Sequence, residues 1–434
     1  MKILSTQSQD IPQILTQIQS CRSKAGDVSE VVRPILDDIR SRGDEAVCDY
    51  TNRFDQWEAS PTRLRVTSDE IQKAYEQIDE VVLDSLKQAM QNIEKVHTGM
   101  LVQKTPVIES MPGVKVWSEF RPVEKVGLYV PGGKAAYPST VLMLGIPAKV
   151  AGCQQVIVCT PAGADGQCNP VVLVAADLCG ITEIYKVGGA QAIATMAYGT
   201  ETIPKVDKIF GPGNAYVTTA KQMVCGEGDC AIDMPAGPSE VCVLASDEAN
   251  PNWVAADLLS QLEHDEDAQA LLVCFSQKMA NQVKACMLEQ MKRLPRQAVV
   301  AESIKISFAV IVQNETEATE LINGYAPEHL EIVLKSVEAE EKMSRTINNA
   351  GSIFLGALTS EPLGDYASGA NHTLPTSGCA KAYPALSASS FGKMVQLQRV
   401  DQTGLDNLRG TVETLANAEG LQAHARAISI RFDS

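Results

Sequence analysis

The sequence contains no long hydrophobic run and no recognisable leader segment. None of its 434 residues lies in a stretch that approaches the roughly 18 uninterrupted apolar residues of a membrane-spanning helix. The first residues, MKILSTQSQD, lack the apolar core of a signal peptide and the arginine-rich bias of a transit peptide. We therefore expect a cytoplasmic protein without a membrane partner.

Paired cysteines and a surplus of positive charge are also missing. The 12 cysteines are scattered, and no two form a Cys-x-x-Cys pair, which is typical of reduced thiols rather than of a disulfide framework or a cysteine-built zinc site. The formal net charge of -16 disfavours a nucleic-acid partner, because the phosphate backbone repels an acidic protein. Small-molecule chemistry is the expected class of function.

Short apolar runs alternate with longer helical patterns from about residue 126 onward. Glycine-rich turns join them, and this rhythm predicts βαβ units and a doubly wound parallel sheet. We expect two Rossmann-like α/β domains. Residues 121–238 form one of them, and a mainly helical segment at 1–120 joins 239–376 in the other. Residues 377–434 form a C-terminal tail that ends in helices.

The dinucleotide fingerprint Gly-x-Gly-x-x-Gly follows none of the predicted strands. A loose variant, GEGDCA at residues 226–231, follows a helical run and is interpreted as a chance match. The turns YVPGG, VGGAQA and FGPGNA still allow close approach of the backbone, and helix N-terminal amides there could receive phosphates. The alternative is that glycine merely lets each turn close, and composition favours neither reading.

Histidine is scarce, and four of the five histidines stand beside acids or amides. They are His264 in QLEH, His329 in PEHL, His372 in DYASGANH and His424 in EGLQAH. Neutral imidazole is a common metal ligand and is easily poised for proton transfer. His97, in IEKVHTG, has no such company, and we expect a structural role for it.

Helix geometry divides the segment SQLEHDED at residues 260–267. Residues three or four apart share a helix face, so Asp257, Gln261 and His264 align, whereas Glu263 points elsewhere. A metal site on this helix would use His264 with Gln261 or Asp257. Zinc suits such donors, and manganese or magnesium would suit a set richer in oxygen. The alternative is a half-buried helix with ordinary polar hydrogen bonds, which this segment alone somewhat favours.

Two further segments carry acids beside histidine. Glu328 and His329 are adjacent in APEHLE, before an apolar strand, and on a loop both could enter one site. Together they offer two proton acceptors of differing basicity, which suits a reaction that moves several protons. In ANAEGLQAH, Glu419 and His424 lie near the end of the chain. A tail that carries ligands would have to dock elsewhere, for example on another subunit.

Across these segments the sequence closely resembles the histidinol dehydrogenase family. The motifs that carry the resemblance are RSRGDEAV, RPVEKVGLYVPGG, VGGAQAIA, VDKIFGPGNAYVT, IDMPAGPSEV, DLLSQLEHD, APEHLEI, AGSIFLG, GDYASGANHTLPT and ETLANAEGLQAH. This family oxidises L-histidinol through L-histidinaldehyde to L-histidine with two NAD molecules, in the final steps of histidine biosynthesis.

The resemblance implies a homodimer with shared active sites, an exchanged C-terminal tail and one zinc ion per subunit. The implied zinc ligands are Gln261, His264, Asp365 and the partner subunit's His424. The implied catalytic proton acceptors are Glu328 and His329. The implied substrate contacts are Ser239, Gln261, His264, His329, Asp365, His372, Glu419 and His424. The implied NAD contacts are Tyr129, Gln191 and Asn214.

Two other functions remain as alternatives. The first is a paralogue of the family that oxidises another small polar alcohol with NAD. It is disfavoured because His329, His372 and Glu419 all stand in family-like contexts. The second is a metal-dependent binding protein that has lost catalysis, which the presence of both Glu328 and His329 disfavours.

Overall fold

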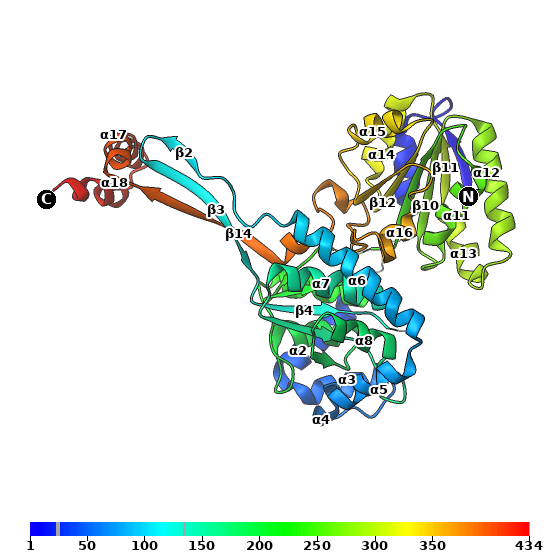
Figure 1. Ribbon diagram of the computed structural model, residues 1–434, viewed down its shortest axis with the longest axis horizontal. Coiled ribbons are helices and arrows are strands. Elements are labelled where there is room, and N and C mark those ends of the chain that lie inside the picture. The colour runs from blue at the N-terminus through cyan, green and yellow to red at the C-terminus, as the bar shows by residue number, and fades with distance from the viewer. Residues whose placement is uncertain (23–26, 133–135, 236, 434) are drawn as a thin grey trace.

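The structure consists of two α/β domains, each built on a parallel sheet, and a slender arm (Figure 1). It is a computed structural model that describes residues 1–22, 27–132, 136–235 and 237–433. One domain is built on a six-stranded sheet and the other on a five-stranded sheet, and the strand pairs of both are parallel. The expected α/β architecture is thereby confirmed. In sheet order, the six strands are β1 (Lys2–Ser5), β11 (Phe308–Ile311), β10 (Gln269–Cys274), β9 (Glu240–Ala245), β12 (His329–Val333) and β13 (Ser352–Leu355). In sheet order, the five strands are β6 (Glu183–Tyr185), β5 (Gln155–Cys159), β4 (Lys125–Tyr129), β7 (Lys208–Phe210) and β8 (Ala231–Ile232).

Helices cover both faces of the six-stranded sheet. Successive side chains of a strand point to opposite faces, so Val241 and Val243 of β9 pack on one side, and Cys242 and Leu244 pack on the other. The helices over the first face are α11 (Pro251–Leu262) and α12 (Gln277–Met291). The helices over the second face are α1 (Ile11–Ser20), α14 (Glu315–Tyr325) and α15 (Val337–Ser344). Both faces of the strands are therefore apolar, as in other fully covered parallel sheets.

The five-stranded sheet is also covered on both faces, and most of the N-terminal helices belong to it. One layer contains α6 (Glu80–Met100), α7 (Pro138–Ala151) and α8 (Pro170–Leu178), with α5 (Ser68–Gln77) outside them. The other layer contains α2 (Ser29–Arg42), α3 (Asp44–Phe54), α9 (Gly189–Tyr198) and α10 (Ala215–Gly226). The expected grouping of residues 1–120 with the six-stranded domain is therefore wrong except for β1 and α1. The apolar face of an amphipathic helix shows that the helix is packed, but it does not show which sheet it covers.

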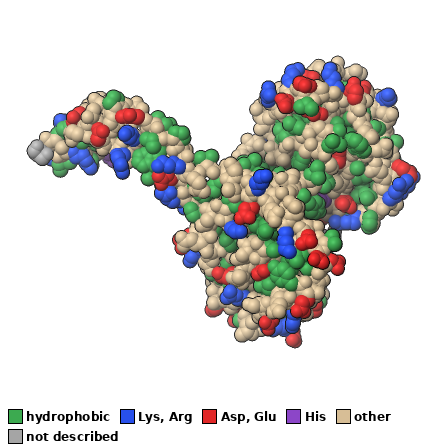
Figure 2. Space-filling model, viewed as in Figure 1, with side chains coloured by type: hydrophobic (Ala, Val, Ile, Leu, Met, Phe, Trp, Pro, Cys, Tyr) green, Lys and Arg blue, Asp and Glu red, His purple; other side chains and the backbone are tan. Residues whose placement is uncertain are grey.

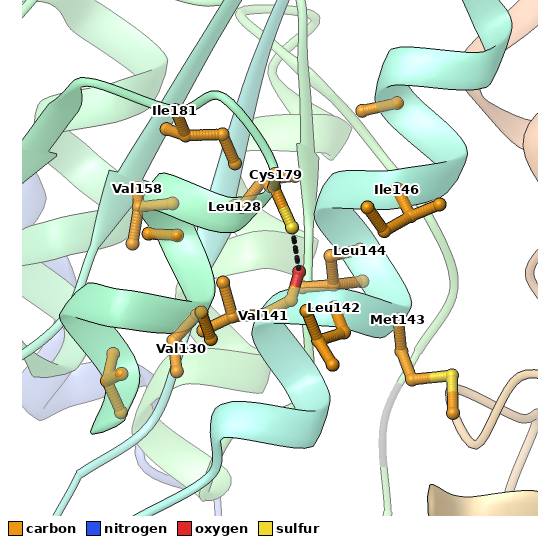
Figure 3. Close-up of a cluster of buried hydrophobic side chains, with 14 of the residues drawn as sticks. Leu128, Val130, Val141, Leu142, Met143, Leu144, Ile146, Val158, Cys179 and Ile181 are labelled. Carbon is orange, nitrogen blue, oxygen red and sulfur yellow. Dashed lines mark hydrogen bonds between the residues drawn. The ribbon is translucent and has the colours of Figure 1, made fainter. Parts of the chain in front are cut away.

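Helix α7 lies in the centre of the five-stranded domain and is apolar on all sides. Figure 3 shows its side chains projecting in several directions, with Val141 next to Cys179 on one side and with Met143 and Ile146 on the other. A helix that is apolar all round is buried on all sides. Inside it stands Pro147, which has no N–H to donate to the preceding turn.

The arm was not expected from the sequence. It is a three-stranded antiparallel sheet in which β3 (Val114–Pro122) pairs with both β2 (Ile108–Met111) and β14 (Gly392–Val400). The helices α17 (Gln402–Ala418) and α18 (Gln422–Ser429) pack on each other at its far end, away from both domains (Figure 1). Hydrophobic side chains remain exposed along it (Figure 2), and they include Ile108, Met394, Val400, Leu415 and Ile430.

Two negative features of the sequence have structural counterparts in the described residues. None of the described helices is both long and apolar enough to span a membrane. All 12 cysteines carry free thiols. Burial raises the pKa of the Cys168 and Cys179 thiols to about 12, so both stay protonated at neutral pH.

Candidate active site

The predicted catalytic pair lies at the amino end of the six-stranded sheet. His329 is the first residue of β12 and Glu328 directly precedes it, while Ser239 directly precedes the neighbouring strand β9. Parallel sheets more often bind ligands at the carboxyl ends of their strands. The reversal arises because helices between parallel strands run back toward the amino end, so that the last turn of α11 and the end of α16 (Glu361–Tyr366) bring polar side chains there.

His329 faces two carboxylates of α16. Its Nε2 lies 3.4 Å from Asp365 Oδ1 and 3.8 Å from Glu361 Oε1. These three atoms all lie within 4.8 Å of one another, so the group could hold a cation. Asp365 was predicted as a site residue, whereas Glu361 was missed. Glu361 lies four residues before Asp365, which places both on one helix face, and this spacing could have revealed Glu361.

The main chain of Glu240 holds both members of the catalytic pair. The Glu240 N–H donates to Glu328 Oε2 at 2.8 Å, and the Glu240 carbonyl lies 3.1 Å from His329 Nδ1. Because β9 and β12 are neighbouring strands in register at this end, the two peptide groups that flank the Glu240 Cα each reach one of the side chains. Glu328 and His329 are therefore close together, as the adjacency in the sequence predicts, with Nδ1 and Oε2 3.6 Å apart.

Burial and neighbouring charges shift the proton affinities of this cluster. Desolvation alone would lower the pKa of His329, but the carboxylates of Glu328, Asp365 and Glu361 outweigh it and raise this pKa to about 10. Burial raises the pKa of Glu328 to about 8 and that of Glu361 to about 8. Burial also acts to raise the pKa of Asp365, but the contact with His329 outweighs it and lowers this pKa to about 2. Such perturbed groups are typical of functional sites.

Gln261, in the last turn of α11, is a buried polar side chain without hydrogen-bond partners among the described residues. It is 1% exposed, and neither its Oε1 nor its Nε2 has a hydrogen-bond partner among the described residues. Such atoms cost about 1–3 kcal/mol each when they are left unpaired, so they usually serve a ligand. The helix ends at Leu262, which places His264 in the following turn, where its N–H donates to the Gln261 carbonyl.

The predicted helix face of Asp257, Gln261 and His264 is thus only partly correct. Asp257 and Gln261 lie on α11, but His264 lies beyond its end. The His264 ring is accessible to solvent, yet desolvation lowers its pKa, and Asp365 acts in the opposite direction. Asp257 Oδ1 accepts a hydrogen bond from the Ser360 hydroxyl at 2.6 Å, and Asp257 is not among the zinc ligands that the resemblance implies.

His372 links the site to the five-stranded domain. Its Nε2 lies 3.5 Å from the Thr140 hydroxyl in the first turn of α7. The preceding residue, Asn371, donates from Nδ2 to the Met143 carbonyl of the same helix at 2.6 Å. The loop after α16 is therefore docked on α7, which brings His372 between the two domains.

Glu419 and His424 do not join this site within one chain. Glu419 follows α17 and His424 lies on α18, so both are at the far end of the arm (Figure 1). Both side chains are exposed. The sequence had placed them on a tail that must dock elsewhere, and the arm places them away from both sheets of their own chain.

The residues predicted for NAD lie at the carboxyl end of the five-stranded sheet. Tyr129 ends β4, Gln191 lies in the first turn of α9, and Asn214 caps α10 through a bond from the Val217 N–H at 3.1 Å. The Gly189 N–H donates to the Tyr129 hydroxyl at 3.1 Å, which closes the turn around Gln191. Gly133, in the first glycine-rich turn, lies outside the described residues.

Asp55 borders this turn and was not predicted. A Cβ on Gly188 would lie 3.3 Å from its Oδ1, and its Oδ2 is buried without a hydrogen-bond partner among the described residues. Burial raises the pKa of Asp55 to about 6. No signal in the sequence indicated it, because Asp55 follows α3, far from the turn along the chain.

Three comparisons with known proteins match nearly the whole chain to the same family. The family model described as histidinol dehydrogenase matches residues 19–432. The chain is 47% identical to histidinol dehydrogenase of Bacteroides thetaiotaomicron over 406 residues, which cover 93% of each chain. It is 44% identical to that of Methanothermobacter thermautotrophicus over 424 residues, which cover 98% of each. The crystal structure of histidinol dehydrogenase from Elizabethkingia anophelis superposes with a TM-score of 0.95 at 42% identity, covering 100% of this chain and 98% of that one.

Proposed function

The chain belongs to the histidinol dehydrogenase family, and on that premise we propose that it oxidises L-histidinol to L-histidine in two NAD-dependent steps through L-histidinaldehyde. The observation that supports this most directly is the buried pair Glu328 and His329, which opens toward Asp365 and Glu361. A reaction that removes two hydrides and several protons needs two bases in one place, and this pair provides them.

Zinc fits the donors at this site. Gln261 offers an unpartnered carbonyl oxygen, Asp365 Oδ1 is likewise unpartnered, and His264 lies in the adjacent turn. We assign these three residues and the partner subunit's His424 as the ligands. When bound, the ion would orient the imidazole and amine of histidinol and polarise groups near them. Its charge would also offset that of Asp365, which moves the pKa of His329 down toward the range of a useful base.

His329 accepts the alcohol proton in the first step. Its Nδ1 is occupied by the Glu240 carbonyl, so the lone pair of the neutral ring lies on Nε2, which faces the site. As the hydroxyl proton moves to Nε2, the carbinol carbon gives its hydride to NAD. His372, which lies beside Thr140 of the five-stranded domain, is assigned to the substrate.

Glu328 acts in the second step, on water. Its raised pKa makes its carboxylate a stronger base than an exposed glutamate, so that it can deprotonate the water that attacks the aldehyde. The proton taken from the water passes to the former carbonyl oxygen, which gives a gem-diol. After His329 has released its first proton to solvent, it takes a hydroxyl proton of the gem-diol as a hydride passes to a second NAD. The carboxylic acid so formed loses its remaining proton to solvent and becomes the carboxylate of histidine. The enclosed position of Glu328, 7% exposed, limits competing reactions of the aldehyde with bulk solvent.

NAD is assigned to the turns that carry Tyr129, Gln191 and Asn214. Two of these residues lie at helix N-termini, where main-chain N–H groups favour phosphate. The arm supports the proposed homodimer, because its exposed apolar side chains suit a covering surface, and Glu419 and His424 lie far from the site in their own chain. Ser239 and Glu419 are assigned as substrate contacts. The proposed location of the enzyme is the cytoplasm.

Turnover with L-histidinol tests this proposal. We expect two NADH per histidinol consumed, and L-histidine as the product by chromatography. The competing family function, oxidation of another small polar alcohol, predicts no turnover with histidinol but NADH formation with that alcohol. That result would refute the substrate assignment while leaving the dehydrogenase chemistry in place.

A further inference from the structure

The side chain of Glu240 is held as firmly as its main chain holds the catalytic pair. Glu240 is 2% exposed, although it is a carboxylate. Arg22 Nε lies 3.0 Å from its Oε1, Arg22 Nη2 donates to its Oε2 at 3.1 Å, and the Ser377 N–H donates to Oε1 at 3.1 Å. Both carboxylate oxygens therefore accept a hydrogen bond, Oε2 from Arg22 and Oε1 from Ser377, while Arg22 Nε lies beside Oε1 without bonding to it.

Arg22 is itself immobilised from two sides. It follows α1, and its Nη2 also donates to the Tyr325 carbonyl at 2.8 Å, while its guanidinium lies 4.1 Å from the centre of the Tyr325 ring. The Tyr325 hydroxyl donates to Gln269 Oε1 at 3.0 Å, and Gln269 is the residue opposite Glu240 on β10. The contacts thus form a closed network around the first residue of β9.

This network acts on the catalytic pair through the main chain of Glu240. The main chain of Glu240 contacts Glu328 through its N–H, in the peptide before the Cα, and His329 through its carbonyl, in the peptide after it. A carbonyl can only accept, so it requires a hydrogen on Nδ1 and leaves Nε2 as the basic atom of the neutral ring. Both peptides are joined at the Glu240 Cα, so a shift of this residue would disturb both proton acceptors together.

We propose that Arg22 and Glu240 are positioning residues of the reaction, whose ion pair fixes the Glu240 main chain, which orients Glu328 and selects the Nδ1–H tautomer of His329. The inference rests on the proposed function, because it presumes that these two side chains transfer the protons. Stability alone does not account for the pair, since a buried ion pair contributes little compared with packed apolar side chains of similar volume. Among the described residues, the hydrogen bonds of the Arg22 and Glu240 side chains go to each other, to Tyr325 and to Ser377, and none goes to a predicted zinc ligand.

Paired substitutions in the zinc-loaded dimer test the kinetic part. Arg22→Met with Glu240→Gln leaves no unpaired buried charge, and Arg22→Lys keeps the charge but loses the planar guanidinium that reaches both Glu240 and the Tyr325 carbonyl. We expect the double variant to lower kcat for histidinol roughly 10- to 100-fold, part of the 10²–10⁴ that a positioned base supplies. KM should stay within about two-fold, because substrate contacts are kept, and Arg22→Lys should be intermediate. The matched control is Arg42→Met, which removes a surface arginine paired with Asp38 and should leave kcat unchanged.

Nitrogen NMR of the histidine rings tests the tautomer directly. The chain has only five histidines, and His329→Asn identifies the signals of that ring. In a pH series, neutral His329 should show Nδ1–H in the parent enzyme and in Arg42→Met, and a mixture of tautomers in the double variant. Glu240→Gln alone keeps one of the two acceptor oxygens and the shape of the side chain, and it provides a variant with a smaller change if the double variant does not fold.

The two proposals fail in different ways. If the parent enzyme does not oxidise histidinol, the proposed function fails, whatever the variants do. If the parent is active and the variants keep its kcat, or if kcat falls while His329 remains wholly in the Nδ1–H form, the positioning role is overturned.

Discussion

The side-chain amide of Asn371 donates to the main-chain carbonyl of Met143 at 2.6 Å, and this carbonyl is the one that the helix itself cannot satisfy. In α7 the natural donor to Met143 would be the N–H of residue 147, but that residue is proline. Asn371 Oδ1 in turn accepts from the Thr373 N–H at 2.9 Å, which shapes the loop around His372. A proline in one domain thus creates the attachment point for the active-site loop of the other.

This relationship predicts coupling between residues 147 and 371. Asn371→Leu should destabilise the protein by about 1–3 kcal/mol because it leaves a buried carbonyl unpaired. In a Pro147→Ala background the helix supplies its own N–H, so the same substitution should cost less. Thermal unfolding of the four proteins measures this, and the lost Thr373 bond cancels because it is common to both comparisons. Equal costs in the two backgrounds would contradict the explanation.

The same variants separate docking of the loop from stability. The double variant Pro147→Ala with Asn371→Leu should recover stability but not turnover, because His372 is no longer held beside Thr140. Steady-state NADH formation with histidinol provides the check. Recovery of both properties together would mean that the attachment matters for folding only.

Gln261 should behave differently from an ordinary buried glutamine. Gln261→Met removes two unpartnered polar atoms, so the metal-free protein should become more stable, by up to about 1–3 kcal/mol, while zinc content falls. Gln269→Met is the matched control, since Gln269 bonds to Tyr325 and to two main-chain carbonyls. It should lose stability and retain zinc. Metal analysis and thermal unfolding after treatment with a chelator decide the matter, and a destabilised Gln261→Met apoprotein would argue against a ligand role.

Glu328→Gln should divide the reaction into its two halves. A glutamine cannot deprotonate the water, so oxidation of added histidinaldehyde should slow by roughly 100-fold or more, whereas oxidation of the alcohol depends on His329 and should change far less. Rapid mixing with histidinol should then give a first phase of one NADH per site instead of two. Similar losses in both half-reactions would reject separate roles for Glu328 and His329.

Mixed dimers should reveal whether the arm completes a site in the other subunit. Neither His264→Asn nor His424→Asn should be active alone, but a hybrid has one site in which both histidines are intact. Random exchange should restore about one quarter of the parent activity, because half of the dimers are hybrids with one good site of two. If differently tagged chains demonstrably exchange and activity stays absent, the shared site is excluded.

Asp55 should make stability depend on pH. Its pKa is raised from 3.8 to about 6, so the folded state binds the proton more tightly than the unfolded state does, and stability falls as pH rises from about 4 to about 6. Above that range the ionised, partly exposed carboxylate should cost about 1–2 kcal/mol. Asp55→Asn should therefore raise Tm at pH 7 to 8 and have no effect near pH 4. The exposed Asp267 provides the control, and a gain that is the same at every pH would point to another cause.

The sequence predicted what depends on local pattern. The alternation of apolar runs with helical periods and glycine-rich turns indicated both parallel sheets, and the adjacency of Glu328 and His329 indicated a shared site, which their 3.6 Å approach is consistent with. The helix containing Gln261 was also expected, although its end was placed two residues too late. Its last turn is followed by a turn that the helical period does not distinguish from helix.

Features that depend on contacts between residues far apart in the chain could not be predicted from the sequence. Gly392 pairs with Pro122 in the arm, and Arg22 meets Glu240 across 218 residues, without any local sign of either contact. The helices between Ser29 and Met100 carry apolar faces that would suit either sheet. Glu361 was within reach, because its position one helical turn before Asp365 is a local signal that the prediction overlooked.

The first strand carries a consequence for synthesis of the chain. Lys2 of β1 lies beside Phe308 of β11, so the ribosome must add some 300 residues before this neighbour exists, a delay of roughly 15 to 60 s at typical elongation rates. In the meantime residues 29–232 emerge complete with all five strands of the other sheet and can fold first. The N-terminal segment, including Arg22, must remain unpaired while that domain folds. The residue proposed to align the proton acceptors is thus among the first made and among the last placed.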